Sequence, residues 1–64
     1  MFILYAKTPD NKRFHPMDYN KGVVVINKIH ATLFSKSEAE KIQKDIPQLE
    51  KINEGWKFEL RSTN

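Results

Sequence analysis

SKSEAEKIQKDIPQLEKINEG, residues Ser35 to Gly55, has the periodicity of one amphipathic helix. Ser35 with Glu38 and Ser37 with Glu40 are overlapping candidates for a capping box at its start. Apolar side chains recur at steps of three and four residues and form a single stripe: Ala39, Ile42, Ile46 and Leu49. We therefore expect a helix that packs its apolar stripe against the rest of the domain.

Pro47 is the exception within this helical pattern. An interior proline removes a backbone hydrogen bond and clashes with the preceding turn. The sequence therefore predicts a kink or a break near Asp45 to Pro47, followed by a second short helix that ends near Gly55.

The first strand is predicted at FILYAK, Phe2 to Lys7, which is apolar on both faces, as in an interior strand. Pro9 and Asp10 suit the centre of a type I turn. Arg13 to His15 is then expected to return as a short antiparallel strand, which Pro16 limits because proline lacks a ladder donor.

The run KGVVVINKIHATLF, Lys21 to Phe34, is the most apolar part of the chain. MDYNKG, Met17 to Gly22, is expected to be a loop in which Gly22 can adopt a positive φ, and the next strand is predicted from Val23 to Phe34. Alternation makes its odd positions the core face: Val23, Val25, Asn27, Ile29, Ala31 and Leu33. A buried Asn27 without a partner costs a few kcal/mol, so a bulge or bend near Asn27 is expected. That bulge would turn Lys28, His30 and Thr32 to the other face.

The last strand is predicted at WKFELR, Trp56 to Arg61, with Trp56, Phe58 and Leu60 pointing one way. Trp56 is interpreted as a core residue rather than a stacking platform. The fold class that follows is α+β: one domain over residues 1–64, with a small antiparallel sheet of about four strands and one helix on one face, in the order β-β-β-α-β.

Length and composition set limits on this domain. Chains as short as 64 residues bury only about 60% of their unfolded surface, so their stability is marginal. There is no cysteine, so a disulfide framework and a thiolate metal site are both excluded. The apolar run from Phe2 to Ala6 is too short for a signal peptide or a membrane span, so we expect a cytoplasmic protein with no membrane partner.

Positive charge is concentrated in the first half of the chain. Residues 1–36 carry six basic and two acidic side chains, a net charge of +4, whereas residues 37–64 carry five basic and six acidic ones, a net charge of −1. A positive field attracts anionic partners such as nucleotides, nucleic acid or acidic protein patches. Charge that only maintains solubility gives the same pattern.

The sheet face that the helix leaves free is expected to carry cations and aromatic rings. Its residues are drawn from Tyr5, Lys7, Arg13, His15, Lys28, His30, Thr32, Lys57 and Arg61. Such a face can pair with phosphates and stack on bases, but an ordinary solvated sheet face has the same composition. Because Val24, Ile26 and Phe34 also fall on this side, two copies could pack these faces together as a homo-oligomer.

Catalytic and cofactor signatures are not found. His15 with Asp18 and His15 with His30 lack the spacing of a known acid/base pair or metal site. Gly22 and Gly55 are better explained by turns than by a phosphate-binding loop. The sequence therefore predicts a protein that is not an enzyme and has neither a metal nor another cofactor.

The segment ATLFSKSEAEKI resembles small proteins of bacteriophages and mobile elements, in which a strand ending in ATLF leads directly into a helix capped by S-x-S-E-A-E. The resemblance implies a non-enzymatic binder directed at host components in the bacterial cytoplasm. It also implies a counter-defence role, in which some such proteins sequester cyclic nucleotide signals.

These observations predict a non-catalytic protein that captures an anionic nucleotide, including a cyclic nucleotide defence signal. Arg13 would pair with a phosphate, Lys21 and Lys28 would add positive field, and Phe14 or Tyr19 would stack on a base. The candidate site residues are Lys12, Arg13, Phe14, His15, Tyr19, Lys21, Lys28 and His30. Two alternatives remain open: a nucleic-acid-binding module, and an inhibitor that binds a host protein directly.

Overall fold

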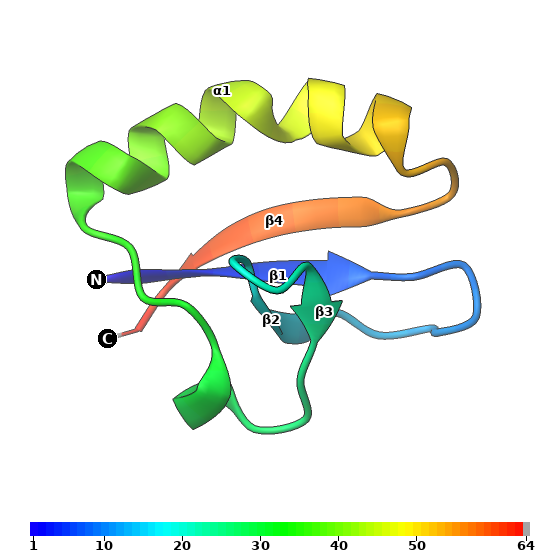
Figure 1. The fold of residues 1–64 in the computed structure, drawn as a ribbon, viewed down its shortest axis with the longest axis horizontal. Coiled ribbons are helices and arrows are strands. Elements are labelled where there is room, and N and C mark those ends of the chain that lie inside the picture. The colour runs from blue at the N-terminus through cyan, green and yellow to red at the C-terminus, as the bar shows by residue number, and fades with distance from the viewer. Residues whose placement is uncertain (64) are drawn as a thin grey trace.

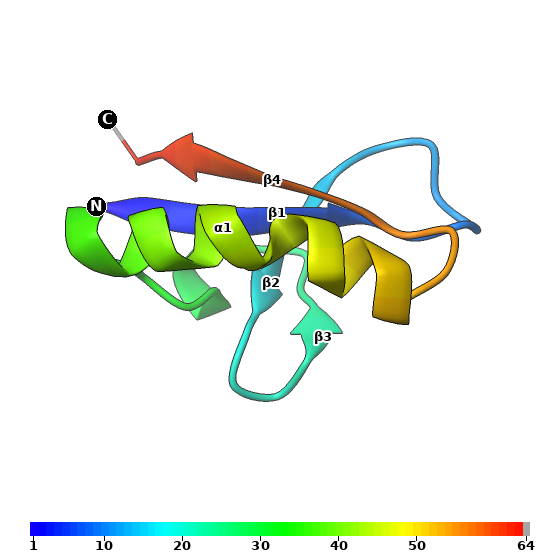
Figure 2. The same ribbon diagram turned by 90° about the horizontal axis from the view of Figure 1, so that it is seen from above.

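A computed structural model describes residues 1–63 as a four-stranded antiparallel sheet with one helix packed on one face (Figure 1). Its elements are β1 (Phe2–Lys7), β2 (His15–Asp18), β3 (Val23–Val24), the 3-10 turn η1 (Lys28–His30), α1 (Lys36–Ile52) and β4 (Lys57–Ser62). The strand order in the sheet is β3-β2-β1-β4. Figure 2 shows α1 lying along the central strand β1. The predicted α+β fold is confirmed.

Helix α1 begins at the predicted capping box. The Ser35 hydroxyl accepts a hydrogen bond from the Glu38 N–H at 3.2 Å, and Glu38 Oε1 accepts one from the Ser35 N–H at 2.8 Å. Of the predicted apolar stripe, Ala39, Ile42 and Ile46 are buried, and the half-buried Leu49 packs against the same core. The cap and the stripe together fix where the helix starts and which side faces the sheet.

The helix continues through Pro47, so the predicted break and the second short helix are wrong. An interior proline costs about 3 kcal/mol relative to alanine. Here Pro47 and Gln43 are both exposed, so the Gln43 carbonyl that loses its ladder partner can bind water. Ile46 and Leu49 pack on the core on either side of Pro47. Tertiary packing on both sides therefore outweighs the local cost.

Strand β1 is central, because it pairs with β2 on one side and with β4 along its whole length on the other. Leu4 and Ala6 face α1 and have no exposed surface. Leu60 and Phe58 lie directly opposite them on β4 and belong to the same cluster, to which Trp56 also packs. The predicted inward direction of Trp56, Phe58 and Leu60 is confirmed.

Strand β2 starts later than predicted. Instead of covering Arg13 to His15, it runs from His15 to Asp18 and contains Pro16. The Pro16 carbonyl accepts a hydrogen bond from the Val25 N–H at 2.8 Å, so the backbone polar groups of Pro16 face the β3 side of the strand. Val25 lies beyond the end of β3, so the missing proline N–H breaks no bond of the ladder.

The predicted turns are present. The turn at Pro9 and Asp10 is closed by a hydrogen bond from the Asn11 N–H to the Thr8 carbonyl at 3.0 Å. Gly22 has a φ of +69° and Gly55 has a φ of +87°. A Cβ at Gly55 would lie 2.8 Å from Pro9 Cγ, so this close contact between two loops requires glycine.

The segment from Val23 to Phe34 is not the long strand that alternation predicts. β3 has only two residues and is followed by a bend and by η1. Ile29 and Leu33, predicted for the core, are 75% and 53% exposed, whereas Phe34, predicted for the other face, is buried. Asn27 is exposed, and its Oδ1 caps η1 by accepting a hydrogen bond from the Ile29 N–H at 3.1 Å. The predicted core face of this segment is therefore wrong, although the chain does bend at Asn27.

The long strand does not form because β2 and β1 pair only over a short length. Near the start of β1, the segment from Thr32 to Phe34 lies against both β1 and β2. The Thr32 N–H donates to the Met17 carbonyl at 3.2 Å, and Phe34 exchanges two backbone hydrogen bonds of 2.8 Å with Phe2. One part of the segment thus forms the short β3 beside β2, and another part, around Phe34, pairs with Phe2 at the start of β1. A strand forms only where a partner strand is available.

Candidate functional site

The sheet face turned away from α1 carries cations and aromatic rings. Directly opposed residues of two antiparallel strands share one face, which places Tyr5 and Lys7 of β1 with Glu59 and Lys57 of β4. We call this the outer face and define it by six residues: Tyr5, Lys7, Phe14, Lys57, Glu59 and Arg61. Three basic side chains and one acidic one give it a net charge of +2.

Arg61 is the centre of the outer face. Its guanidinium carbon lies 4.3 Å from the centroid of the Tyr5 ring and 5.6 Å from that of Phe14. Its Nε donates to the Glu59 carboxylate, which fixes the guanidinium plane and leaves the four Nη protons for another acceptor. Lys7 Nζ lies 5.8 Å from the Phe14 centroid on the same face. The face therefore holds two cations next to half-buried rings, an arrangement that can bind an anion.

Two lysines oppose each other on the outer face. Lys7 and Lys57 are direct partners in the register of β1 and β4, a position at which side chains come within about 5 Å at Cβ and like charges destabilise the sheet. An anion held between them would remove this repulsion.

The chain itself covers the other end of this sheet face. Ile3 lies on the same side as Tyr5 by alternation and is only 3% exposed. It borders a hollow of about 290 Å³ with Ile29, Ala31 and Leu33, residues that come from η1 and the segment after it. The expectation of a fully open face therefore holds only for its half around Tyr5 and Lys7.

The predicted cluster from Lys12 to His15 is divided between two faces. Lys12 and Arg13 are exposed in the β1–β2 loop, next to Phe14 on the outer face. His15 lies opposite Ala6 in the register and therefore on the face that α1 covers. The predicted cluster thus has Phe14 on the outer face, His15 on the other face, and Lys12 and Arg13 exposed in the loop between β1 and β2.

The remaining predicted residues lie elsewhere. Lys28 and His30 are exposed in η1, which borders Met1 and Ile3 at the start of β1, whereas Arg13 lies in the loop beyond the end of β1. Tyr19 and Lys21 lie in the β2–β3 turn. The eight candidates do not form one site within a single chain, because the path of residues 25–33 carries Lys28 and His30 to the other end of the sheet.

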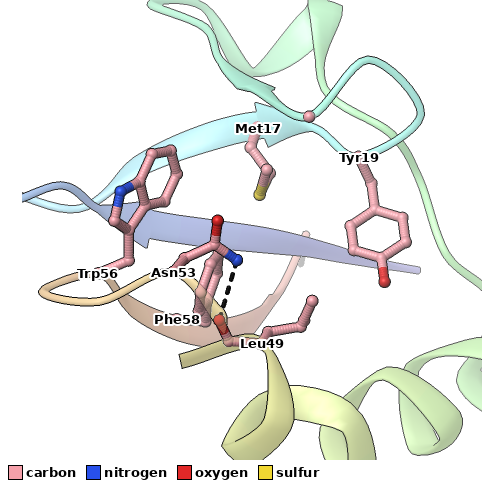
Figure 3. Close-up of a pocket in the computed structure, with 7 residues that line it drawn as sticks. Met17, Tyr19, Leu49, Asn53, Trp56 and Phe58 are labelled. Carbon is pink, nitrogen blue, oxygen red and sulfur yellow. Dashed lines mark hydrogen bonds between the residues drawn. The ribbon is translucent and has the colours of Figure 1, made fainter. Parts of the chain in front are cut away.

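A pocket of about 390 Å³ lies between the β2–β3 turn, the end of α1 and the start of β4 (Figure 3). It is lined by Met17, Tyr19, Gly22, Leu49, Asn53, Trp56 and Phe58. Tyr19 is the one predicted site residue in this lining. The sequence gives no local signal for Asn53 or Trp56 as pocket residues, because only the fold brings the helix end next to the β2–β3 turn.

Comparisons with protein-family models, with curated proteins and with solved structures found no match. The resemblance to phage proteins, the counter-defence role and the homo-oligomer therefore stay predictions. No helix within residues 1–63 has the length and apolar content to span a bilayer. In the same residues no group of three His, Asp or Glu side chains is arranged to hold a metal ion.

Proposed function

We propose that this protein is a non-catalytic binding module that holds single-stranded nucleic acid on its outer face. Its cations would pair with successive phosphates. The Arg61 guanidinium, which lies over the Tyr5 ring, and the Phe14 ring would stack on bases. The position of Arg61 over two rings is the observation that supports this proposal most directly.

The shape of the outer face favours a strand over a single captured nucleotide. The face extends across the paired strands β1 and β4, and its rings are half-buried on an open sheet surface. An open surface can contact several nucleotides in a row, whereas capture of one nucleotide requires walls on most sides. The exposed Lys12 and Arg13 would extend the positive surface from Phe14.

Binding of a fluorescein-labelled oligothymidine, followed by anisotropy at several salt concentrations, tests this proposal. With Lys7, Lys57 and Arg61 each neutralising one phosphate, the slope of log K against log salt should be about −2, and Lys7→Ala should reduce it to about −1.4. Phe14→Ala should weaken binding and leave the slope unchanged. Lys44→Ala, at an exposed position of α1, is the matched control and should affect binding less than Lys7→Ala.

The variant Lys57→Glu tests whether the opposed lysines Lys7 and Lys57 serve binding or are incidental. Opposite Lys7, a glutamate replaces repulsion by attraction, so the variant should gain about 0.2–1 kcal/mol of stability while it loses oligonucleotide affinity. Equal anisotropy for wild type, Lys7→Ala and Lys57→Glu at low salt would reject the outer face as the binding surface. Binding of AMP as tight as that of the oligonucleotide would favour nucleotide capture instead.

A further inference from the structure

The pocket on the α1 side of the sheet has flat walls. Trp56 stacks on Phe58 with ring centroids 5.8 Å apart and an angle of 25° between the planes. Tyr19 is held edge-on by the buried Phe34, at 5.6 Å and 78°. Both rings are thus fixed by neighbours in the core, and they border a space of about 390 Å³, within the range of small-ligand sites.

Asn53 supplies the polar group of this pocket. Its Nδ2 donates a hydrogen bond to the Leu49 carbonyl at 2.9 Å, which fixes the orientation of the amide. Figure 3 shows the Oδ1 directed away from Leu49, on the side of Met17 and Trp56. Among residues 1–63 this oxygen has no hydrogen-bond partner, and Nδ2 keeps a second proton. The pocket therefore offers one acceptor and one donor on the same rigid amide.

We propose that this pocket binds a nucleobase-like heteroaromatic ring, with a purine of the adenine type as the best match. An adenine edge carries an N–H donor beside a ring-nitrogen acceptor, the complement of an asparagine amide. The Trp56 ring and the Met17 thioether would contact the faces and edges of such a ring. This site is separate from the outer face, since its residues lie on the opposite side of the sheet.

The chain provides its own reporter, because Trp56 is its one tryptophan. Titration with adenosine should give saturable quenching of tryptophan fluorescence. Leu49→Phe fills the pocket and should abolish that response, whereas Ile52→Phe, at a 67% exposed position of the same helix, should retain it. Asn53→Leu keeps a similar volume without the polar atoms and should weaken adenosine binding by about tenfold or more.

Urea unfolding of each variant shows whether it is folded, and two-dimensional ¹H–¹⁵N spectra with adenosine locate the contact. Shifts at Gly22, Asn53 and the Trp56 indole support the pocket. Absence of a saturable response to adenosine, guanosine and uridine in the folded wild type overturns the proposal, as do shifts confined to Lys7, Phe14 and Arg61. Because oligonucleotide anisotropy is measured separately with outer-face variants, either proposal can fail alone.

Discussion

Replacement of Pro47 by alanine should stabilise the protein. Pro47 lies in the interior of α1 and is exposed, so its side chain contributes little packing that alanine would lose. Alanine would restore an N–H donor for the carbonyl of Gln43 and remove the clash of the proline ring with the preceding turn. Both changes favour the folded state, because α1 already spans this position.

The magnitude follows from two opposing effects. Proline in a helix interior is about 3 kcal/mol less favourable than alanine. Proline also restricts the unfolded chain, and its removal returns roughly 0.4–1 kcal/mol of that advantage. The net gain is therefore about 2 kcal/mol. A chain of 64 residues has roughly 3–10 kcal/mol of total stability, so this change is a large fraction of it.

Urea unfolding followed by circular dichroism measures this gain. With an m value of about 1 kcal/mol/M the midpoint should rise by about 2 M urea, and the melting temperature by roughly 8–16 °C. Gln48→Ala, at the exposed neighbouring position, should stay within about 0.5 kcal/mol of wild type. The folded spectrum should not change. A marked rise of the helical signal in Pro47→Ala would show that the wild-type helix is interrupted, which contradicts this reasoning. An unchanged midpoint would contradict the expected gain in stability.

Four further changes test the fold, each by urea unfolding. Ser35→Ala removes the helix cap and should cost about 1 kcal/mol. The Ser35 backbone and side chain lower the pKa of Glu38 below its ordinary value of 4.5, so its contribution is present above that pH and lost as the pH falls through the lowered pKa; Glu38→Gln should flatten this part of the pH profile. Leu4→Ala, at a fully buried position, should cost about 2–5 kcal/mol and leave much of the chain unfolded. Ile26→Ala, at a 96% exposed position, should stay within about 0.5 kcal/mol of wild type.

The elements that sequence predicts well are those whose signals are local. The capping box of Ser35 with Glu38 needs only three residues of separation, and the stripe that includes Ile42 and Ile46 is set by helix geometry. The alternation of Phe58 and Leu60 likewise predicts their direction. The predicted break at Pro47 does not occur, because the local cost of proline is outweighed by the packing of the helix on the sheet, which local sequence does not reveal.

The structure of the segment from Val23 to Phe34 cannot be predicted from local patterns, because it depends on partners far away in sequence. Its β-branched residues favour a strand, but most of the segment has no strand to pair with. Asn27 uses its side chain to cap η1, a local alternative to ladder hydrogen bonds that asparagine commonly adopts. This path separates Lys28 and His30 from Arg13, so the predicted residues do not form one site. Alternation within the two paired strands places Tyr5, Lys7, Lys57 and Arg61 on the outer face, whereas His15 lies on the other face.

Within residues 1–63, the repulsive lysine pair and the unpaired amide oxygen described above both lie at the surface. Within residues 1–63 no buried side-chain polar atom lacks a hydrogen-bond partner. By contrast, Lys7 faces Lys57 across two paired strands, and Asn53 presents an unpaired amide oxygen to an open pocket. A chain this small has little stability to spare, so a repulsive pair on its central strand has to be offset by the rest of the fold. Because proteins concentrate such violations at functional sites, the outer face and the Asn53 pocket are where binding is to be sought, rather than the core that holds them apart.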